Sequence, residues 1–177
     1  MEDYLPIIYL SLLLIFLSTV AIILFRQIIK ARRIESRVFQ LENKLKKEDG
    51  AAKEYYELAS LYLDKKLFFQ AIQLLQKAIK KAENEKVEPE NMALIYNALG
   101  FAYFAQEQYD MAIRNYKEAL KLFPAYTIAI NNLANAYEKK QMTKLALETY
   151  KKCLEYDPKN PVALKKIESL EKRLVAS

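Results

Sequence analysis

Residues 93–124 read ALIYNALGFAYFAQEQYDMAIRNYKEALKLFP, and residues 127–158 repeat the pattern 34 residues later as TIAINNLANAYEKKQMTKLALETYKKCLEYDP. Self-similarity at a fixed period indicates a repeat architecture. A third copy lies upstream, 41 residues before the middle one. The positions shared by the three copies are Tyr55, Leu58, Ala59, Tyr62, Ala71, Leu75 and Ala78, then Tyr96, Leu99, Gly100, Tyr103, Ala112, Tyr116 and Ala119, then Ile130, Leu133, Ala134, Tyr137, Ala146, Tyr150 and Cys153.

Each copy contains two helical stripes. On a helix with about 3.6 residues per turn, Leu99, Gly100 and Tyr103 share one face, and Ala112 shares a face with Tyr116 on the next helix. The small residues allow two antiparallel helices to approach closely. The sequence therefore predicts an all-α chain in which each copy is a pair of packed helices.

This spacing resembles the tetratricopeptide repeat (TPR), with copies at about residues 52–85, 93–126 and 127–160. The resemblance implies a superhelix whose first helices line a groove that holds another polypeptide. Some TPR proteins grip a C-terminal carboxylate with a Lys and Asn clamp, but Tyr56 and Ser60 stand where that clamp would begin. The groove-facing sites that the resemblance implies are Tyr56, Ser60, Leu63, Asn97, Phe101, Phe104, Asn131, Asn135 and Glu138.

Two segments flank or interrupt the copies. The charged residues 83–91 are predicted to form a longer exposed connection between the first two copies. Residues 161–177 are predicted to close the stack, because their apolar side chains share one helical face. These side chains are Leu164, Ile167, Leu170 and Leu174.

The chain begins with a predicted membrane anchor, residues 1–25. From Ile7 to Phe25 there are 19 uncharged residues, which as a helix cross roughly 28 Å of hydrocarbon at about 1.5 Å per residue. A cleaved signal peptide is the alternative, but it requires a basic start and a small-residue cleavage site. This start is acidic, so the sequence favours a retained span.

Residues 26–50 are predicted to form a basic helical stalk. Eight basic and two acidic residues lie in 26–47, so the positive-inside rule keeps the repeats on the side of the membrane where the chain is made. Because residues 26–47 alone hold a net charge of +6, equal to that of the whole chain, the repeats are nearly balanced, which disfavours nucleic-acid binding. The side chains expected at the lipid surface are Arg26, Lys30, Arg32 and Arg33.

The stalk also carries a narrow apolar seam. It either packs on lipid or on the first repeat, or it mediates self-association or binding of a partner helix. The seam consists of Ile34, Val38, Leu41 and Leu45.

Catalysis is disfavoured by composition. The chain has no histidine, one cysteine and two glycines, so it lacks Ser-His and Cys-His pairs, zinc clusters and Gly-rich phosphate loops. We therefore predict no catalytic residue, no cofactor, no metal and no small-molecule substrate. Cys153 is interpreted as a small core residue, with a reactive thiol beside Lys151 and Lys152 as the alternative.

The whole arrangement of span, basic stalk, three repeats and closing helix resembles the photosystem I assembly proteins of plastids and cyanobacteria. That resemblance implies a single-pass protein of the thylakoid membrane, with its repeats in the stroma and with photosystem I subunits or assembly factors as partners. A tethered receptor for precursor proteins or chaperones in organelle import is one alternative. A self-associating organiser that uses the stalk seam is another.

Overall fold

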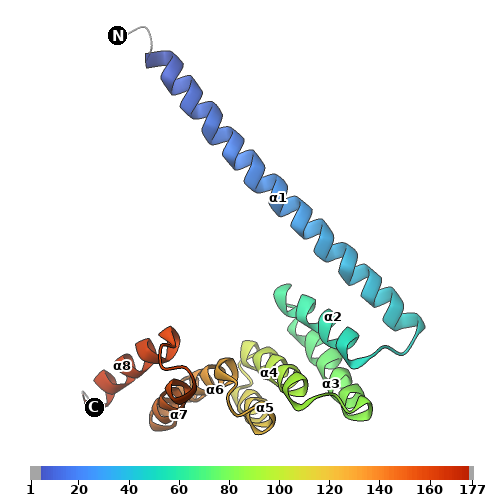
Figure 1. Ribbon diagram of the computed structural model, residues 1–177, viewed down its shortest axis with the longest axis vertical. Coiled ribbons are helices and arrows are strands. Elements are labelled where there is room, and N and C mark those ends of the chain that lie inside the picture. Colours follow the sequence, from blue (N-terminus) through green and yellow to red (C-terminus); the bar gives the residue numbers. More distant parts are fainter. Residues whose placement is uncertain (1–4, 176–177) are drawn as a thin grey trace. The chain divides into compact units, whose positions relative to one another are not determined.

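The computed structural model describes residues 5–175, and every regular element in that range is an α-helix (Figure 1). This confirms the predicted all-α fold class. The chain forms two compact units that divide after Lys47. The helices are α1 (Leu5–Lys47), α2 (Ala52–Asp64), α3 (Phe68–Glu85), α4 (Pro89–Ala105), α5 (Tyr109–Leu122), α6 (Thr127–Lys139), α7 (Thr143–Tyr156) and α8 (Pro161–Val175).

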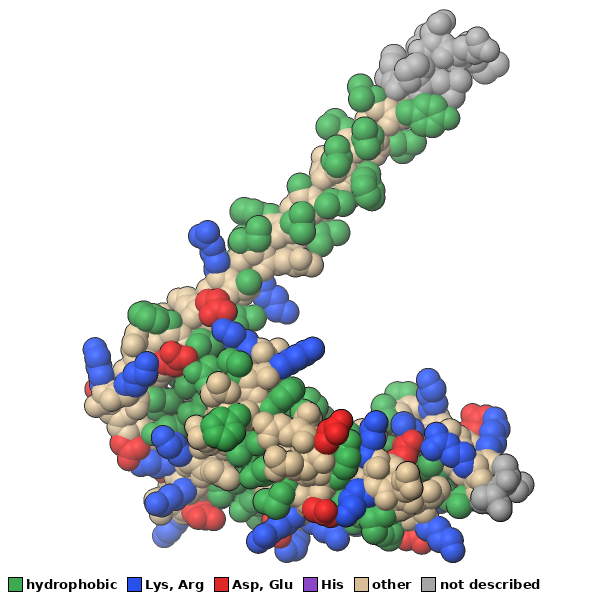
Figure 2. All heavy atoms as spheres, turned by 180° about the vertical axis from the view of Figure 1, so that it is seen from behind, with side chains coloured by type: hydrophobic (Ala, Val, Ile, Leu, Met, Phe, Trp, Pro, Cys, Tyr) green, Lys and Arg blue, Asp and Glu red, His purple; other side chains and the backbone are tan. Residues whose placement is uncertain are grey.

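The first unit is the single helix α1. Apolar side chains cover its N-terminal part, and Lys and Arg side chains appear farther along it (Figure 2). Ser18 and Thr19 donate their hydroxyls to the carbonyls of Leu14 and Phe16, at 2.8 and 2.7 Å, so they add no unpaired donor to the apolar stretch. Within the described residues, α1 is the one helix long and apolar enough to cross a membrane. The predicted span and stalk are parts of one continuous helix, with no helix end near residue 25.

The second unit is a stack of helix pairs. Helices α2 and α3, α4 and α5, and α6 and α7 form one pair for each copy of the repeat, and α8 packs against α7 (Figure 1). Each second helix also contacts the first helix of the next pair. Every pair therefore covers an apolar face of its neighbour, as stacked repeats must.

Close contact between the helices of a pair depends on a small residue opposite a large one. In the second copy, a Cβ atom on Gly100 would lie 2.6 Å from Cε1 of Tyr116. The Tyr116 side chain is itself only 1% exposed, so its ring is enclosed by the core. The matching positions of the other copies are also buried, and they hold Ala59 with Leu75 and Ala134 with Tyr150.

The turn inside each pair uses a left-handed residue that is not glycine. Lys66, Glu107 and Gln141 have φ angles of 60°, 60° and 59°. In each case the next residue's N–H donates to a carbonyl five residues earlier, at 2.8 to 3.0 Å. The three copies therefore share one turn geometry, in which a side chain occupies a backbone conformation that favours glycine.

The extra residues between the first two copies lengthen helices instead of forming a loop. Helix α3 has 18 residues where α5 and α7 have 14, and α4 has 17 where α2 and α6 have 13. The prediction of a long exposed connection over 83–91 is therefore wrong. Lys86, with φ 52°, ends α3, and Pro89 starts α4 because its fixed φ suits the first helical position.

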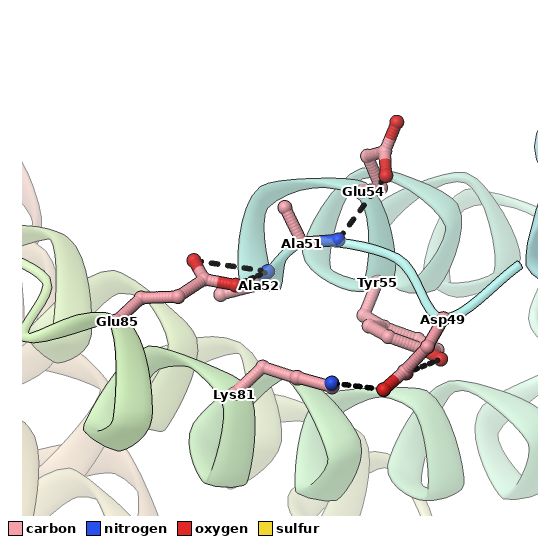
Figure 3. Close-up of polar contacts among 7 residues, drawn as sticks. All are labelled: Asp49, Ala51, Ala52, Glu54, Tyr55, Lys81 and Glu85. Carbon is pink, nitrogen blue, oxygen red and sulfur yellow. Dashed lines mark hydrogen bonds and ion pairs between the residues drawn. The ribbon is translucent and has the colours of Figure 1, made fainter.

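The start of the second unit is fastened to α3 by polar contacts (Figure 3). Asp49 forms an ion pair with Lys81 and accepts a hydrogen bond from the Tyr55 hydroxyl at 3.2 Å. The Glu85 carboxylate accepts from the N–H of Ala52 at 3.1 Å, which satisfies one of the free donors at the start of α2. The start of α2 and the end of α3 are thus joined by residues that are 33 positions apart in the sequence.

Helix α8 closes the described stack with a face that partly matches the predicted one. Ala163 and Leu170 are buried, whereas Leu164 and Leu174 are exposed. Of the predicted side chains, Leu170 and the half-buried Ile167 do lie on the packing face. Ala163 packs in place of Leu164, because a small residue permits the closer approach.

Candidate functional site

The stack has an inner side formed by the first helices of the pairs. Helix α2 contacts α4, and α4 contacts α6, whereas no comparable contact joins α3 to α5 or α5 to α7 among the described residues. First helices that lie closer together than second helices make the stack curve toward the first-helix side. This curved surface of α2, α4 and α6 is called the groove below.

All nine predicted groove residues lie on these three helices, and none of them is fully buried. The structure therefore leaves part of each side chain accessible. Three occur on each helix: Tyr56, Ser60 and Leu63 on α2, Asn97, Phe101 and Phe104 on α4, and Asn131, Asn135 and Glu138 on α6.

Phe101 and Phe104 differ in how much of the side chain is exposed to solvent. Phe101 is 44% exposed. Phe104 is half-buried, and its ring meets the edge of the Tyr109 ring with centroids 5.4 Å apart. An exposed aromatic side chain on a groove helix is typical of a protein contact site, so Phe101 is the candidate apolar contact of the groove.

Amide side chains connect the second and third copies. Asn132 donates from Nδ2 to Oδ1 of Asn97 at 3.0 Å, and Asn97 donates to the Tyr126 hydroxyl at 3.4 Å. The sequence interpretation missed Asn132, although it directly follows a predicted groove residue. These bonds fix the Asn97 side chain, which therefore shapes the groove and is less available to a ligand.

Ser60 and Glu138 are also engaged within the protein. The Ser60 hydroxyl donates to the Tyr56 carbonyl at 2.9 Å. The Glu138 carboxylate lies 2.8 Å from Nζ of Lys166 and 3.7 Å from Nη1 of Arg173 on α8. Glu138 therefore joins the closing helix to α6, and it offers little charge to a ligand.

Two hollows adjoin the predicted groove residues. The first, of about 330 Å³, is lined by Tyr56, Val87 and Leu94 and is mostly apolar. The second, of about 410 Å³, is lined by Asn131, Asn135 and residues of α7 and α8. The groove thus offers an apolar site at the first copy and a site of mixed character, with several amide side chains, at the third.

A further hollow of about 430 Å³ lies on the other side, where α3 and α5 separate, and its lining includes Gln76, Met111 and Arg114. It lies away from the nine predicted residues.

The described residues present no cluster of His, Cys, Asp or Glu that could hold a metal ion. Cys153 is buried, its Sγ lies 3.9 Å from the Thr127 carbonyl oxygen, and burial raises the pKa of its thiol. A raised pKa disfavours the reactive thiolate, so the interpretation of Cys153 as a core residue is supported over that of a reactive thiol.

The four basic residues predicted at the lipid surface are exposed on α1. They follow the apolar part of the helix within about two turns, which is where cations meet lipid headgroups. These residues are Arg26, Lys30, Arg32 and Arg33.

Comparison with known proteins identifies the repeats. The model of the tetratricopeptide repeat family matches residues 51–125 and 91–159. The chain is 34% identical to the ycf37 protein of Cyanophora paradoxa over 165 residues, covering 93% of this chain and 92% of that protein. It is also 34% identical over 124 residues to the chloroplastic TPR protein PYG7 of Arabidopsis thaliana, covering 70% of this chain and 40% of PYG7.

Solved structures share the fold at lower identity. MamA matches with a TM-score of 0.71 and 22% identity, over 81% of this chain and 80% of that chain. The first TPR domain of Spaghetti (RPAP3), solved with an HSP90 peptide, matches with a TM-score of 0.64 and 21% identity, over 72% of this chain and 96% of that domain.

Proposed function

Because the chain belongs to the tetratricopeptide repeat proteins, and within them to the plastid ycf37 family, we propose that it is a membrane-anchored scaffold that assists the assembly of photosystem I. In this proposal the groove holds a segment of a photosystem I subunit or of another assembly factor. Helix α1 spans the thylakoid membrane once, and the repeats lie in the stroma. The protein binds and positions its partner without catalysing a reaction.

The observation that carries the proposal is the exposed Phe101 in the middle of the groove. Apolar side chains at the centre of a binding surface contribute most of its affinity when a partner covers them. The first-copy hollow adds a second apolar surface, between the starts of α2 and α4. A partner segment with spaced apolar side chains fits such a surface.

The photosystem I assignment is supported by the arrangement of span, basic stalk, repeats and closing helix, together with relatives from plastids. A membrane tether also raises the effective concentration of any partner held in the same bilayer. A weak groove contact is therefore sufficient for a scaffold of this kind.

A tethered receptor for chaperone tails is less well supported. The RPAP3 structure contains an HSP90 peptide that ends in acidic residues. Here Tyr56 and Ser60 supply no cation, and Lys53 shares the lining of the first-copy hollow with Glu85. Beside the third copy, Glu138 already neutralises Lys166. An acidic tail would find little uncompensated positive charge in this groove.

The test is co-purification from detergent-solubilised thylakoids with wild-type protein and with Phe101→Ala. Phe101→Ala is expected to reduce recovery of photosystem I subunits or assembly factors by about tenfold, since a buried aromatic contact contributes about 1–2 kcal/mol. The matched control is Phe69→Ala, because Phe69 is 63% exposed on α3, a second helix. Recovery of no such partner by the wild-type protein, or equal recovery with Phe101→Ala, would refute the proposal.

A further inference from the structure

The third-copy hollow is lined by two residues that carry unpaired buried groups. It is bounded by α6, α7 and α8 and has a volume of about 410 Å³. Asn131 and Tyr150 line it, and the Oδ1 atom of Asn131 and the hydroxyl of Tyr150 are buried without a hydrogen-bond partner. Buried polar atoms are normally paired, so two in one hollow indicate that something else completes them.

The orientation of the Asn131 amide is fixed by its neighbours. Asn160 accepts at Oδ1 from the N–H of Ala163 at 3.0 Å and donates from Nδ2 to Asp157 at 3.0 Å. Asn131 must therefore donate its own Nδ2 to Oδ1 of Asn160, at 3.1 Å. Its Oδ1 atom is left as a free acceptor beside the hollow.

Tyr150 supplies the complementary donor. Its side chain is 0% exposed, and burial raises the pKa of its hydroxyl, so the proton stays on the oxygen. The residues that line the hollow thus supply one unpaired acceptor and one unpaired donor. An amide group presents the matching N–H donor and carbonyl acceptor.

The charges around the hollow disfavour a carboxylate as the bound group. Lys166 lines the same hollow, but the Glu138 carboxylate lies 2.8 Å from its ammonium group. The free acceptor on Asn131 would also repel a carboxylate. An uncharged ligand group therefore fits the hollow better than an anion.

The rim of the hollow is apolar. Ile128 is 58% exposed and Val162 is exposed beside it. Both unpaired atoms are inaccessible to solvent in this structure, so an entering group must displace neighbouring side chains, a change that is common at binding interfaces. A narrow side chain reaches these atoms more easily than a whole backbone segment does.

We propose that the third-copy hollow binds the side-chain amide of a glutamine or asparagine in an extended partner peptide, with the ligand N–H donating to Oδ1 of Asn131 and its carbonyl accepting from Tyr150. Apolar residues that flank the amide contact Ile128 and Val162. This inference rests on the proposed peptide-binding function and specifies one chemical feature of its ligand.

The probes are labelled acetylated pentapeptides of sequence Ser-Val-X-Val-Ser with an amidated C-terminus, where X is glutamine, glutamate or leucine. Binding to the full chain in detergent micelles is measured by fluorescence anisotropy, with empty micelles as the background. The glutamine peptide is expected to bind about five- to tenfold more tightly than the other two. Absence of binding, equal binding of glutamine and leucine, or tighter binding of glutamate would overturn the inference.

Two tyrosine variants distinguish a ligand contact from a structural one. Tyr150→Phe removes the unpaired hydroxyl, and it is expected to abolish the glutamine preference while leaving the leucine peptide unchanged. Tyr116→Phe is the matched control, since Tyr116 is the equivalent buried tyrosine of the second copy and lies outside the hollow. A preference that survives Tyr150→Phe, or that Tyr116→Phe removes equally, contradicts the assignment.

The two proposals fail separately. If the glutamine preference is absent while thylakoid partners still depend on Phe101, the inference about the hollow is wrong and the scaffold proposal stands. If the preference is present while no photosystem I partner is recovered, the hollow binds its ligand class and the scaffold proposal is wrong.

Discussion

Gly100→Ala tests how the helix pairs are held together. The new Cβ atom would lie 2.6 Å from Cε1 and 2.7 Å from Cδ1 of Tyr116, whereas ordinary contacts lie at 3.4–4 Å. The Tyr116 ring is enclosed, so the second pair must shift before it can accept the Ala and Tyr combination that the third copy holds at Ala134 and Tyr150. The substitution is therefore expected to destabilise the protein, although alanine is the better helix former.

The magnitude follows from two opposing effects. Overpacking an enclosed site costs about 2–3 kcal/mol, and replacing glycine with alanine in a helix gains about 1 kcal/mol. The free energy of unfolding should fall by about 1–2 kcal/mol. In a Tyr116→Leu background the clash is absent, as in the first copy with Ala59 and Leu75, so the same substitution should stabilise by up to about 1 kcal/mol.

The assay is a double-mutant cycle with urea unfolding followed by circular dichroism. A coupling energy of about 2–3 kcal/mol between the two positions is expected, with a reversed sign of the Gly100→Ala effect. If Gly100→Ala has the same effect in both backgrounds, the close contact with Tyr116 does not determine the helix spacing.

Gly100→Leu adds three more carbons at this contact and is expected to unfold the stack, seen as loss of cooperative melting of the repeats, whereas Phe101→Ala should leave helicity unchanged. Gln141→Gly should raise the free energy of unfolding by up to about 1 kcal/mol, because glycine adopts the left-handed conformation without strain; Lys140→Gly, at an ordinary negative φ, is the control and should not stabilise. Lys81 depresses the pKa of the Asp49 carboxyl below 3.8, so the ion pair contributes stability above the unfolded pKa that is lost as pH falls through the folded one. Asp49→Asn should therefore lower Tm at neutral pH, and its difference from wild type should disappear in acid; a constant difference at all pH values would show that the charge is irrelevant. Glu138→Gln should speed hydrogen exchange in α8 by weakening its contacts with Lys166 and Arg173, with little change in α2; unchanged exchange in α8 would mean that these contacts do not hold the helix.

Periodicity was sufficient to predict the helix pairs. The positions of Gly100 and Tyr116 have counterparts in all three copies. A contact that is made in every copy produces a repeated spacing of residues, which a single sequence is sufficient to show. Cys153 followed the same rule and is buried at its expected site. The all-α architecture was predictable because the apolar stripes alone specify which helix faces pack.

Contacts between copies were not predictable in the same way. The bond from Asn132 to Asn97 and the ion pair of Lys166 with Glu138 occur once each, so no repeated spacing marks them. The left-handed backbone at Gln141 was not predictable, because the residue at this position is not a glycine. The extra residues after the first copy lengthen α3 and α4. The composition of this charged segment suits a helix as well as a loop, so composition alone did not predict the longer helices.

The most direct measurement is photo-crosslinking in intact thylakoids with a benzophenone amino acid at position 101 of the groove. The control places the same residue at position 69, which is exposed on α3. The account predicts a crosslink from position 101 to a photosystem I subunit or assembly factor, and none of that product from position 69. The same products from both positions, or no protein crosslinked at position 101, would contradict it.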